Sequence, residues 1–335
     1  MYALLALLGL GAAFALVAGI GGDDDAVDET PEQEEMPPVV SLQTFTDGDD
    51  AVLDQRYVED ARANADDLVA EGELTRAEAD AALDAIRIAQ NPANLDTGAG
   101  DDYVVTGDGA DTVRAGAGDD VVVGGGGNDL VSLGDGDDVY GSDVRTISLP
   151  DDVIGFPDSG FGIFGTDAAL EGGDDTIMGG AGMDAISDSF GRNVVFGNQG
   201  QDFIVTVDED GPGASPDTVD GGFGNDTLVV DQGDVVTGNQ GRDLVTVDLF
   251  AGVSDDYAEI TITDFQPGID TLELEGSFGL LMPPSPTGPD DVPVNPISVA
   301  DLADGTAAIV SVNGIPVVRV MGGAGMTVAD VRISV

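Results

Sequence analysis

The chain has 335 residues, of which 65 are acidic and 10 basic, and its formal net charge of −55 excludes nucleic-acid binding through a basic patch. The absence of cysteine and histidine excludes disulfides, thiolate metal sites and most histidine-based acid–base chemistry. Such a charge is typical of disorder, yet 42% of the residues are hydrophobic and recur in short runs between acidic turns.

The N-terminal segment, residues 1–20 (MYALLALLGLGAAFALVAGI), carries no charged side chain. A helix of this length, at about 1.5 Å per residue, would span about 30 Å of hydrocarbon. We interpret it as a membrane anchor, a cleaved signal-like segment or a buried or interfacial helix. No Lys or Arg precedes the apolar run, although Ala13-Phe14-Ala15 resembles a cleavage site. Residues 21–40 are acidic and rich in Gly and Pro, as expected of a solvated linker.

Residues 41–96 are expected to form a partial rung and a helical hairpin. Asp47–Val52 (DGDDAV) resembles half of the repeats that follow it. Tyr57–Gln90 predicts two helices, because a capping box at Thr75–Glu78 opens the second and Asn91-Pro92 ends it. The hairpin is expected to be either an insertion between rungs or a separate small domain.

Five nonapeptides then follow without a gap, from Thr97 to Gly141. In each of them the second and fourth residues are glycine, the sixth is aspartate and the eighth is large and apolar or aromatic. The glycines are Gly98, Gly100, Gly107, Gly109, Gly116, Gly118, Gly125, Gly127, Gly134 and Gly136, and the aspartates are Asp102, Asp111, Asp120, Asp129 and Asp138.

Each repeat predicts a glycine-rich turn followed by a short strand. Glycine permits positive φ and close backbone approach in the turn, and position eight is the only strand residue expected to point inward. Two repeats then make one turn of a coil, which stacks Asp102 on Asp120 and Asp138 along one edge and Asp111 on Asp129 along the other. Because these like charges would repel at about 4.8 Å spacing, a cation is required. Oxygen-only ligands favour Ca²⁺, since Mg²⁺ demands near-ideal octahedral geometry.

These repeats resemble the G-G-x-G-x-D-x-U-x nonapeptide of RTX (hemolysin-type) calcium-binding proteins, which bacteria export by type I secretion. The resemblance implies a mainly β fold, a right-handed parallel β-roll, with several Ca²⁺ ions held by the aspartates and by carbonyls of the glycine turns. It departs from the pattern at the first position, where glycine occurs only at Gly124.

A second, irregular block covers residues 170–246. Its position-six residues are Asp175, Asp184, Asp202, Asp226 and Asp243, which we also predict to be metal ligands. Asn193 takes this place in one repeat, and Val230–Thr237 is one residue short, so we expect the second block to be under-occupied by calcium.

The remaining segments are an insertion and a cap. Residues 142–169 interrupt the array, with added core packing favoured over a partner site. Residues 247–335 are expected to form an antiparallel β cap, in which Ile262–Leu274 resembles the segment that closes RTX rolls and Asn313-Gly314 predicts a hairpin turn. The last residues, Val331–Val335, predict a strand, and the resemblance implies that they carry a secretion signal.

The function expected from these features is that of a secreted or cell-surface calcium-binding protein whose array folds in extracellular Ca²⁺. An alternative is a membrane-anchored adhesin or matrix protein that uses the roll as a spacer, with a protein or polysaccharide partner that the sequence does not name. A carboxylate-based polysaccharide-active enzyme is a weaker alternative, because Trp is absent and aromatics are 5% of the chain. We therefore expect a protein that is not an enzyme.

Overall fold

The computed structural model describes residues 42–45, 51–55, scattered positions from 58 to 70, and residues 75–141, 173–208, 215–281 and 296–335. These residues belong to one compact unit, Val40–Val335. The predicted anchor and linker, most of the first half of the helical hairpin and the whole insertion at 142–169 lie outside the described residues. No helix among the residues described is long and apolar enough to cross a membrane.

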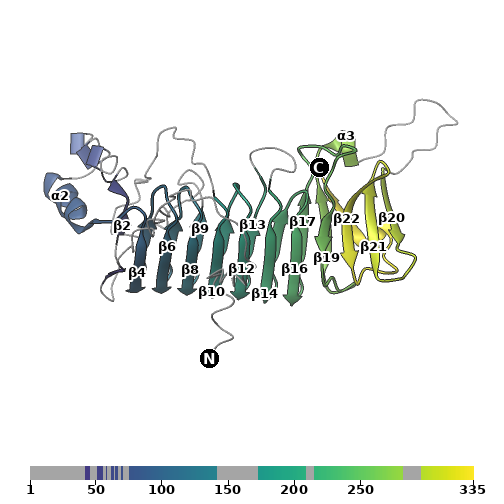
Figure 1. The fold of residues 1–335 in the computed structure, drawn as a ribbon, viewed down its shortest axis with the longest axis horizontal. Coiled ribbons are helices and arrows are strands. Elements are labelled where there is room, and N and C mark those ends of the chain that lie inside the picture. The colour runs from purple at the N-terminus through teal and green to yellow at the C-terminus, as the bar shows by residue number, and fades with distance from the viewer. Residues whose placement is uncertain are drawn as a thin grey trace, which may run out of the picture. The chain divides into compact units, whose positions relative to one another are not determined.

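Two long sheets dominate the unit, and through the repeats the strands of each sheet lie side by side in chain order (Figure 1). The first sheet runs β1 (Gln43–Thr44), β4 (Asn94–Ala99), β6 (Thr112–Ala117), β8 (Leu130–Asp135), β10 (Thr176–Ala181), β12 (Val194–Gln199), β14 (Thr218–Phe223), β16 (Val235–Gln240), β18 (Ile260–Ile262), β22 (Ile315–Met321), β21 (Ala307–Val312) and β20 (Ile297–Asp301). The second runs β23 (Val331–Ser334), β19 (Thr271–Glu275), β17 (Leu244–Asp248), β15 (Thr227–Val230), β13 (Phe203–Val205), β11 (Ala185–Ser187), β9 (Val139–Gly141), β7 (Val121–Val123), β5 (Tyr103–Val105), β2 (Ala51–Leu53) and β3 (Arg87–Ile88). The helices are α2 (Arg76–Ala85), α3 (Phe278–Leu281) and the 3-10 turn η2 (Val328–Asp330).

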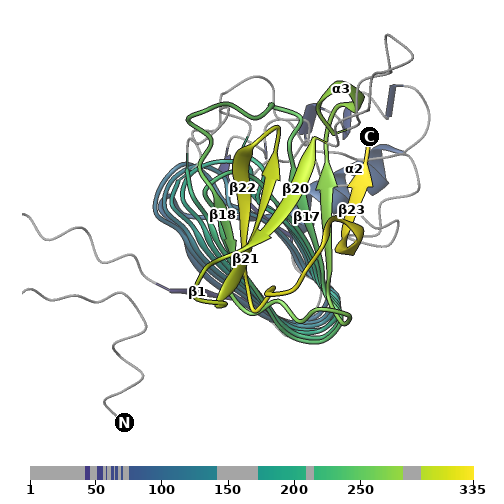
Figure 2. The same cartoon turned by 90° about the vertical axis from the view of Figure 1, so that its right-hand side faces the viewer.

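The chain alternates between the sheets, so that two repeats complete one turn of the coil, as predicted. Figure 2, which looks along the stack, shows successive turns superposed on one another. From β4 to β18 and from β2 to β19, neighbouring strands within each sheet are parallel, and Leu95 pairs with Val113 and then Val131. The prediction of a mainly β fold with parallel, roll-like sheets is confirmed; its right-handedness stays a prediction.

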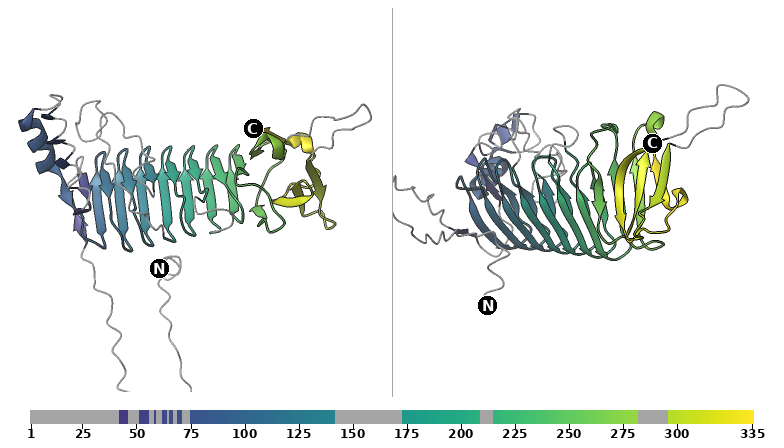
Figure 3. Two further views of the ribbon diagram at one scale, coloured as in Figure 1. Left: turned by 90° about the horizontal axis from the view of Figure 1, so that it is seen from above. Right: turned by 45° about the vertical axis from the view of Figure 1, so that its right-hand side comes forward.

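The two blocks of repeats form one continuous stack. Strand β8 pairs directly with β10 although partners such as Asp129 and Asp175 are 46 residues apart, so the second block supplies the rung that follows the first block in the stack. The left panel of Figure 3 shows the evenly spaced rungs on both sides of this point. The division into a regular and an irregular block therefore does not interrupt the stacking.

The core is a row of apolar side chains from position eight of each repeat. Val113 and Val131 from the first sheet and Val104 and Val122 from the second are almost fully buried in one cluster. The prediction that only position eight points inward is wrong, because position one is also buried in both sheets. Ala115 in the first sheet and Val230 in the second are fully buried in the same cluster.

A second apolar cluster covers the outer face of the second sheet at its N-terminal end. Ala79 and the partly buried Leu83 of α2 pack with Tyr103, Val105 and Val121, which face away from the main core. Strands β2 and β3, which flank the helical segment in the chain, are both part of this sheet. The segment therefore departs from a rung and returns to it; the full hairpin stays a prediction.

The C-terminal strands close both sheets. Strands β20, β21 and β22 are antiparallel, and Val312 pairs with Ile315 across Asn313-Gly314, both of which have positive φ, as predicted for the hairpin. The expectation that the whole end is antiparallel is wrong, since β22 pairs parallel with β18 and β23 pairs parallel with β19. The last rung is thus covered by strands that continue its own hydrogen-bond ladder.

Candidate metal centre

The glycine turns pack backbone against backbone between successive rungs. A Cβ built on Gly116 would lie 2.0 Å from the carbonyl oxygen of Gly98, and one on Gly118 would lie 2.1 Å from that of Gly100. Both glycines have positive φ, +125° and +132°. Of the predicted position-two and position-four glycines, all but Gly107 have positive φ; a Cβ on Gly107 would instead lie 2.7 Å from Oδ2 of Asp54. No side chain fits between these turns, so carbonyl oxygens line both edges of the stack.

The position-six aspartates form two ladders along these edges. In each ladder the backbone N–H of one aspartate donates to Oδ1 of the next, at 2.8 Å from Asp102 to Asp120 and 2.9 Å from Asp111 to Asp129. We name them by their first members. The Asp102 ladder contains Asp102, Asp120, Asp138, Asp184, Asp202, Asp226 and Asp243, and the Asp111 ladder contains Asp111, Asp129 and Asp175 followed by Asn193. All ten predicted aspartates are therefore brought into register.

In eight of these ten aspartates the second carboxylate oxygen is buried without a hydrogen-bond partner. This holds for Oδ2 of Asp111, Asp120, Asp129, Asp138, Asp184, Asp202, Asp226 and Asp243. The side chains are 3% exposed or less, so water does not replace the missing donor. An unsatisfied buried charge is strongly destabilising, and a row of them marks the atoms that a cation would contact.

Burial sets the protonation of the ladders in the absence of a cation. Desolvation raises the pKa of Asp120 and of Asp129 to about 8, against the opposing effect of the backbone N–H groups that they accept, and neighbouring carboxylates raise it further. Desolvation by burial likewise raises the pKa of Asp184 to about 7 and that of Asp138 to about 6. Without a cation, part of each ladder is protonated near neutral pH.

Three further aspartates extend the ladders and were not predicted. Asp217 and Asp234 continue the Asp111 ladder beyond Asn193, and Asp270 accepts from the N–H of Asp243 at 3.2 Å at the end of the other. Each stands two residues before a buried apolar residue, Val219, Val236 or Leu272. This D-x-apolar spacing is the sequence signal that would have found them, because insertions and a deletion break the nine-residue count around them.

The segment that resembles an RTX closing motif ends the ladders with two acids. Asp264 accepts the N–H groups of Gly238 and Asn239, at 3.0 and 2.8 Å, which no later repeat is present to accept. Asp270 accepts from Asp243 and from Gln266, while Phe265 is buried in the core. Within this short motif, Asp264 and Asp270 thus accept the hydrogen bonds of the last turn, and Phe265 covers the core at the last rung.

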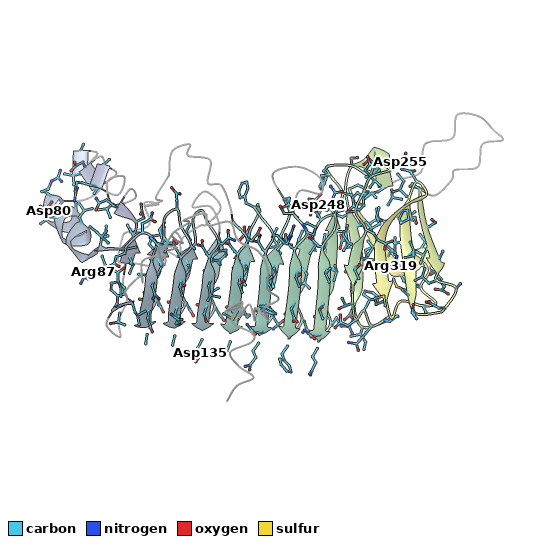
Figure 4. The ribbon with its side chains drawn as sticks, viewed as in Figure 1. Asp80, Arg87, Asp135, Asp248, Asp255 and Arg319 are labelled. Carbon is cyan, nitrogen blue, oxygen red and sulfur yellow. The ribbon has the colours of Figure 1, made fainter. Side chains whose placement is uncertain are left out.

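An outer ladder at position five runs alongside the buried ones. The N–H of Asp119 donates to Oδ1 of Asp101 at 2.9 Å, and that of Asp137 donates to Asp119 at 3.0 Å. Asp119 and Asp137 are exposed. In Figure 4 the stick of Asp135 likewise projects away from the ribbon at the edge of the stack. Such exposed acids contribute to the negative surface charge, but unlike the ladder aspartates they remain hydrated.

The buried ladders fit calcium by the chemistry of their donors. Most repeats offer one carboxylate oxygen without a partner, and the tightly stacked glycine turns offer backbone carbonyls, which are the hard ligands that Ca²⁺ prefers. Among the described residues no group of three or more acidic side chains is arranged so that it could hold a metal ion by itself. The ligands of an ion would thus be single carboxylates from the ladders together with turn carbonyls.

Comparison with known families agrees with this chemistry. The model of the RTX calcium-binding nonapeptide repeat matches four segments of the chain, residues 94–113, 105–140, 171–204 and 213–234. A comparison with curated proteins finds no match. The chain therefore carries RTX repeats of the calcium-binding class, in the part of the fold that holds the two ladders.

Proposed function

We propose that this chain, whose central residues are RTX calcium-binding repeats, is an exported calcium-binding protein whose roll folds when it meets extracellular Ca²⁺. The row of buried Oδ2 atoms without partners is the observation that carries the proposal. Several like charges buried in line oppose folding, whereas a divalent cation between rungs converts their repulsion into coordination. Folding and calcium binding are then one event.

This coupling suits a protein that must cross a membrane unfolded. Sites with dissociation constants of about 10⁻⁴ to 10⁻³ M stay empty in the cytosol and fill outside the cell. The resemblance to RTX proteins supports export by a type I secretion machinery and an extracellular or cell-surface location. In cell fractions, we expect the full chain in the medium or on the surface; retention in the cytosol of secreting cells would contradict this part of the proposal.

The test of the function itself is circular dichroism of the full chain during a calcium titration. We expect β signal to rise with a midpoint of about 10⁻⁴ to 10⁻³ M Ca²⁺ and to be lost on chelation. The same titration with Mg²⁺ is the matched control and should give little change, because Mg²⁺ retains its waters. A chain with the same spectrum in calcium and in chelator would refute the proposal.

A second candidate is a surface-held spacer, favoured by the continuity of the stack. Parallel pairing runs without interruption from β4 to β18, and such solenoids are stiffened by each added rung. If residues 1–20 remain as an anchor, the roll would hold the C-terminal strands away from the membrane. Membrane sedimentation of the full chain in calcium, compared with a chain lacking residues 1–20, separates this role from that of a released protein.

We propose a binding role and not a catalytic one. The carboxylates of the ladders lie in a regular, buried row, an arrangement suited to coordination, whereas a general acid and base need access to a substrate. Incubation of the calcium-loaded chain with acidic polysaccharides, followed by analysis of the products, tests this directly. Cleavage or epimerisation would contradict it.

A further inference from the structure

The Asp111 ladder contains one rung where the expected carboxylate is replaced by an amide. Asn193 keeps one half of the usual role, since its Oδ1 accepts from the N–H of Asp175 at 3.0 Å. Its other atom is the donor Nδ2, which bonds the carbonyl of Phe190 at 3.0 Å. This side chain therefore lacks the partnerless oxygen that the aspartates of the other rungs provide.

The same rung contains a buried carboxylate at another position of the repeat, that of Asp188. Asp188 occupies the first position of this repeat, directly after strand β11, where the rungs on either side carry small or neutral residues. Its equivalents after β5, β7 and β13 are Thr106, Gly124 and Thr206, while Asp54 takes this place after β2, at the first rung. Asp188 is fully buried, and it is the only acid among the positions after β5, β7, β11 and β13.

The side chain of Asp188 presents the atom that Asn193 lacks. Its Oδ1 accepts from the N–H of Phe190 at 3.3 Å, whereas its Oδ2 is buried with no hydrogen-bond partner. The carboxyl group lies beside that of Asp175, whose Oδ2 is approached at 3.4 Å by the hydroxyl of Tyr140. Position one faces the ladder in other repeats too, because a Cβ on Gly124 would lie 2.9 Å from Oδ2 of Asp129.

We infer that Asp188 is a calcium ligand that replaces the carboxylate lost at Asn193, so that the Asp111 ladder binds calcium through this rung. The inference rests on the proposed function and adds a ligand outside position six of the repeat. It also reverses the sequence-based expectation that this rung is poorly occupied. The ligand of a rung can thus move from position six to position one while the backbone hydrogen bond stays in place.

Two substitutions in the full chain test the inference through the number of calcium ions bound, measured by equilibrium dialysis in saturating calcium. Asp188→Asn keeps the size of the side chain and its acceptor for Phe190 but removes the anionic oxygen. We expect it to bind about one ion fewer per chain than wild type, because the charge count of the ligands sets affinity. Asp255→Asn, at an exposed position near the cap (Figure 4), makes the same change in net charge and should bind the wild-type number.

The reverse substitution decides the question even if Asp188→Asn folds poorly. Asn193→Asp restores the ordinary repeat, and if Asp188 already supplies the ligand we expect no additional ion. A gain of about one ion in Asn193→Asp, or wild-type number and affinity in Asp188→Asn, would overturn the inference. Wild-type protein that binds no calcium would instead refute the proposed function, so the two failures are distinguishable.

Discussion

At the scale of the residue, each ladder aspartate has two oxygens with different tasks. Oδ1 accepts a backbone N–H from the neighbouring rung and fixes the side chain, while Oδ2 is left for a cation. The hydrogen bond does not involve the cation, so it orients the side chain without occupying the oxygen that the cation would contact. An amide in place of the carboxylate separates the two tasks, because it retains Oδ1 and replaces Oδ2.

This separation predicts the effect of Asp120→Asn. The variant keeps an acceptor for the N–H of Asp102 and loses only the buried charge, so we expect its apparent calcium affinity to fall by roughly tenfold or more while the roll still reaches the wild-type β spectrum at saturating calcium. Binding isotherms and circular dichroism at saturating calcium measure the two effects. Asp119→Asn, in the exposed outer ladder, is the matched control and should leave affinity nearly unchanged; an equal loss in both variants would contradict the assignment.

The same buried oxygens predict how pH acts on the calcium-free chain. Burial raises the pKa of Asp120 and Asp129 to about 8 in the folded chain, above the ordinary value near 3.8 that these groups have when unfolded. A raised pKa gives stability that is complete below the unfolded value and is lost as pH rises through the folded one. We therefore expect the β signal of the calcium-free chain, measured by circular dichroism, to be largest near about pH 4, where the carboxyls are protonated, and to be lost as the pH rises to about 8. In saturating calcium the trend should reverse, since bound calcium requires the carboxylates ionised. A calcium-free β signal that is constant or increases over this range would contradict the burial of these groups.

The sequence predicts the ligands well where repeats are contiguous and poorly where they are not. Asp102 to Asp138 follow from a fixed count of nine, whereas Asp217 and Asp234 do not, because the chain between neighbouring ladder members is 24 and 17 residues long there. Counting residues along the repeats does not predict Asp188, because its proposed role depends on its burial and on the residues beside it in the folded rung. The number of residues between ladder members varies along the chain, whereas the stacking of the rungs determines which residues belong to a ladder.

At the scale of the element, the turn and the strand contribute differently to a rung. The strands place one apolar residue per repeat in the core, and position one adds a second where it is large and apolar, as at Leu133 in the first sheet and Val230 in the second. The turns contribute no side chain between rungs and depend on the absence of Cβ. This explains why sequence periodicity predicts the strands and the stacking, but not the strand lengths or the helical segment that covers the outer face of the second sheet.

The turn geometry predicts that Gly116→Ala is strongly destabilising. The new Cβ would lie 2.0 Å from the carbonyl oxygen of Gly98, at a backbone φ of +125°, so steric overlap adds to the cost of about 1–2 kcal/mol for a left-handed alanine. Gly305→Ala is the control, because its φ is +71° and no atom lies near its Cβ. Thermal denaturation in calcium should show a loss of well over about 2 kcal/mol for the first and about 1 kcal/mol for the second. Similar losses would mean that the turns do not stack this closely.

At the scale of the whole molecule, a net charge of −55 acts in two places. Exposed acids such as Asp119 and Asp135 repel one another through water, whereas the ladder acids repel one another in a dry interior. Dissolved salt screens the first kind of repulsion and hardly affects the second. The two contributions can therefore be separated by comparing a monovalent salt with calcium.

This comparison gives a prediction for the size of the chain, measured by small-angle X-ray scattering. In chelator at low salt we expect a radius of gyration approaching that of an unfolded chain of this length, about 65 Å, and a much smaller value in millimolar calcium. About 1 M NaCl shortens the Debye length to about 3 Å, so it should contract the calcium-free chain only in part, without producing the β spectrum. The buried Oδ2 atoms require a ligand in direct contact, which a diffuse ion atmosphere does not provide. If salt alone gave the same radius and spectrum as calcium, screening of surface charge would suffice to fold the roll, and coordination along the ladders would not be what drives it.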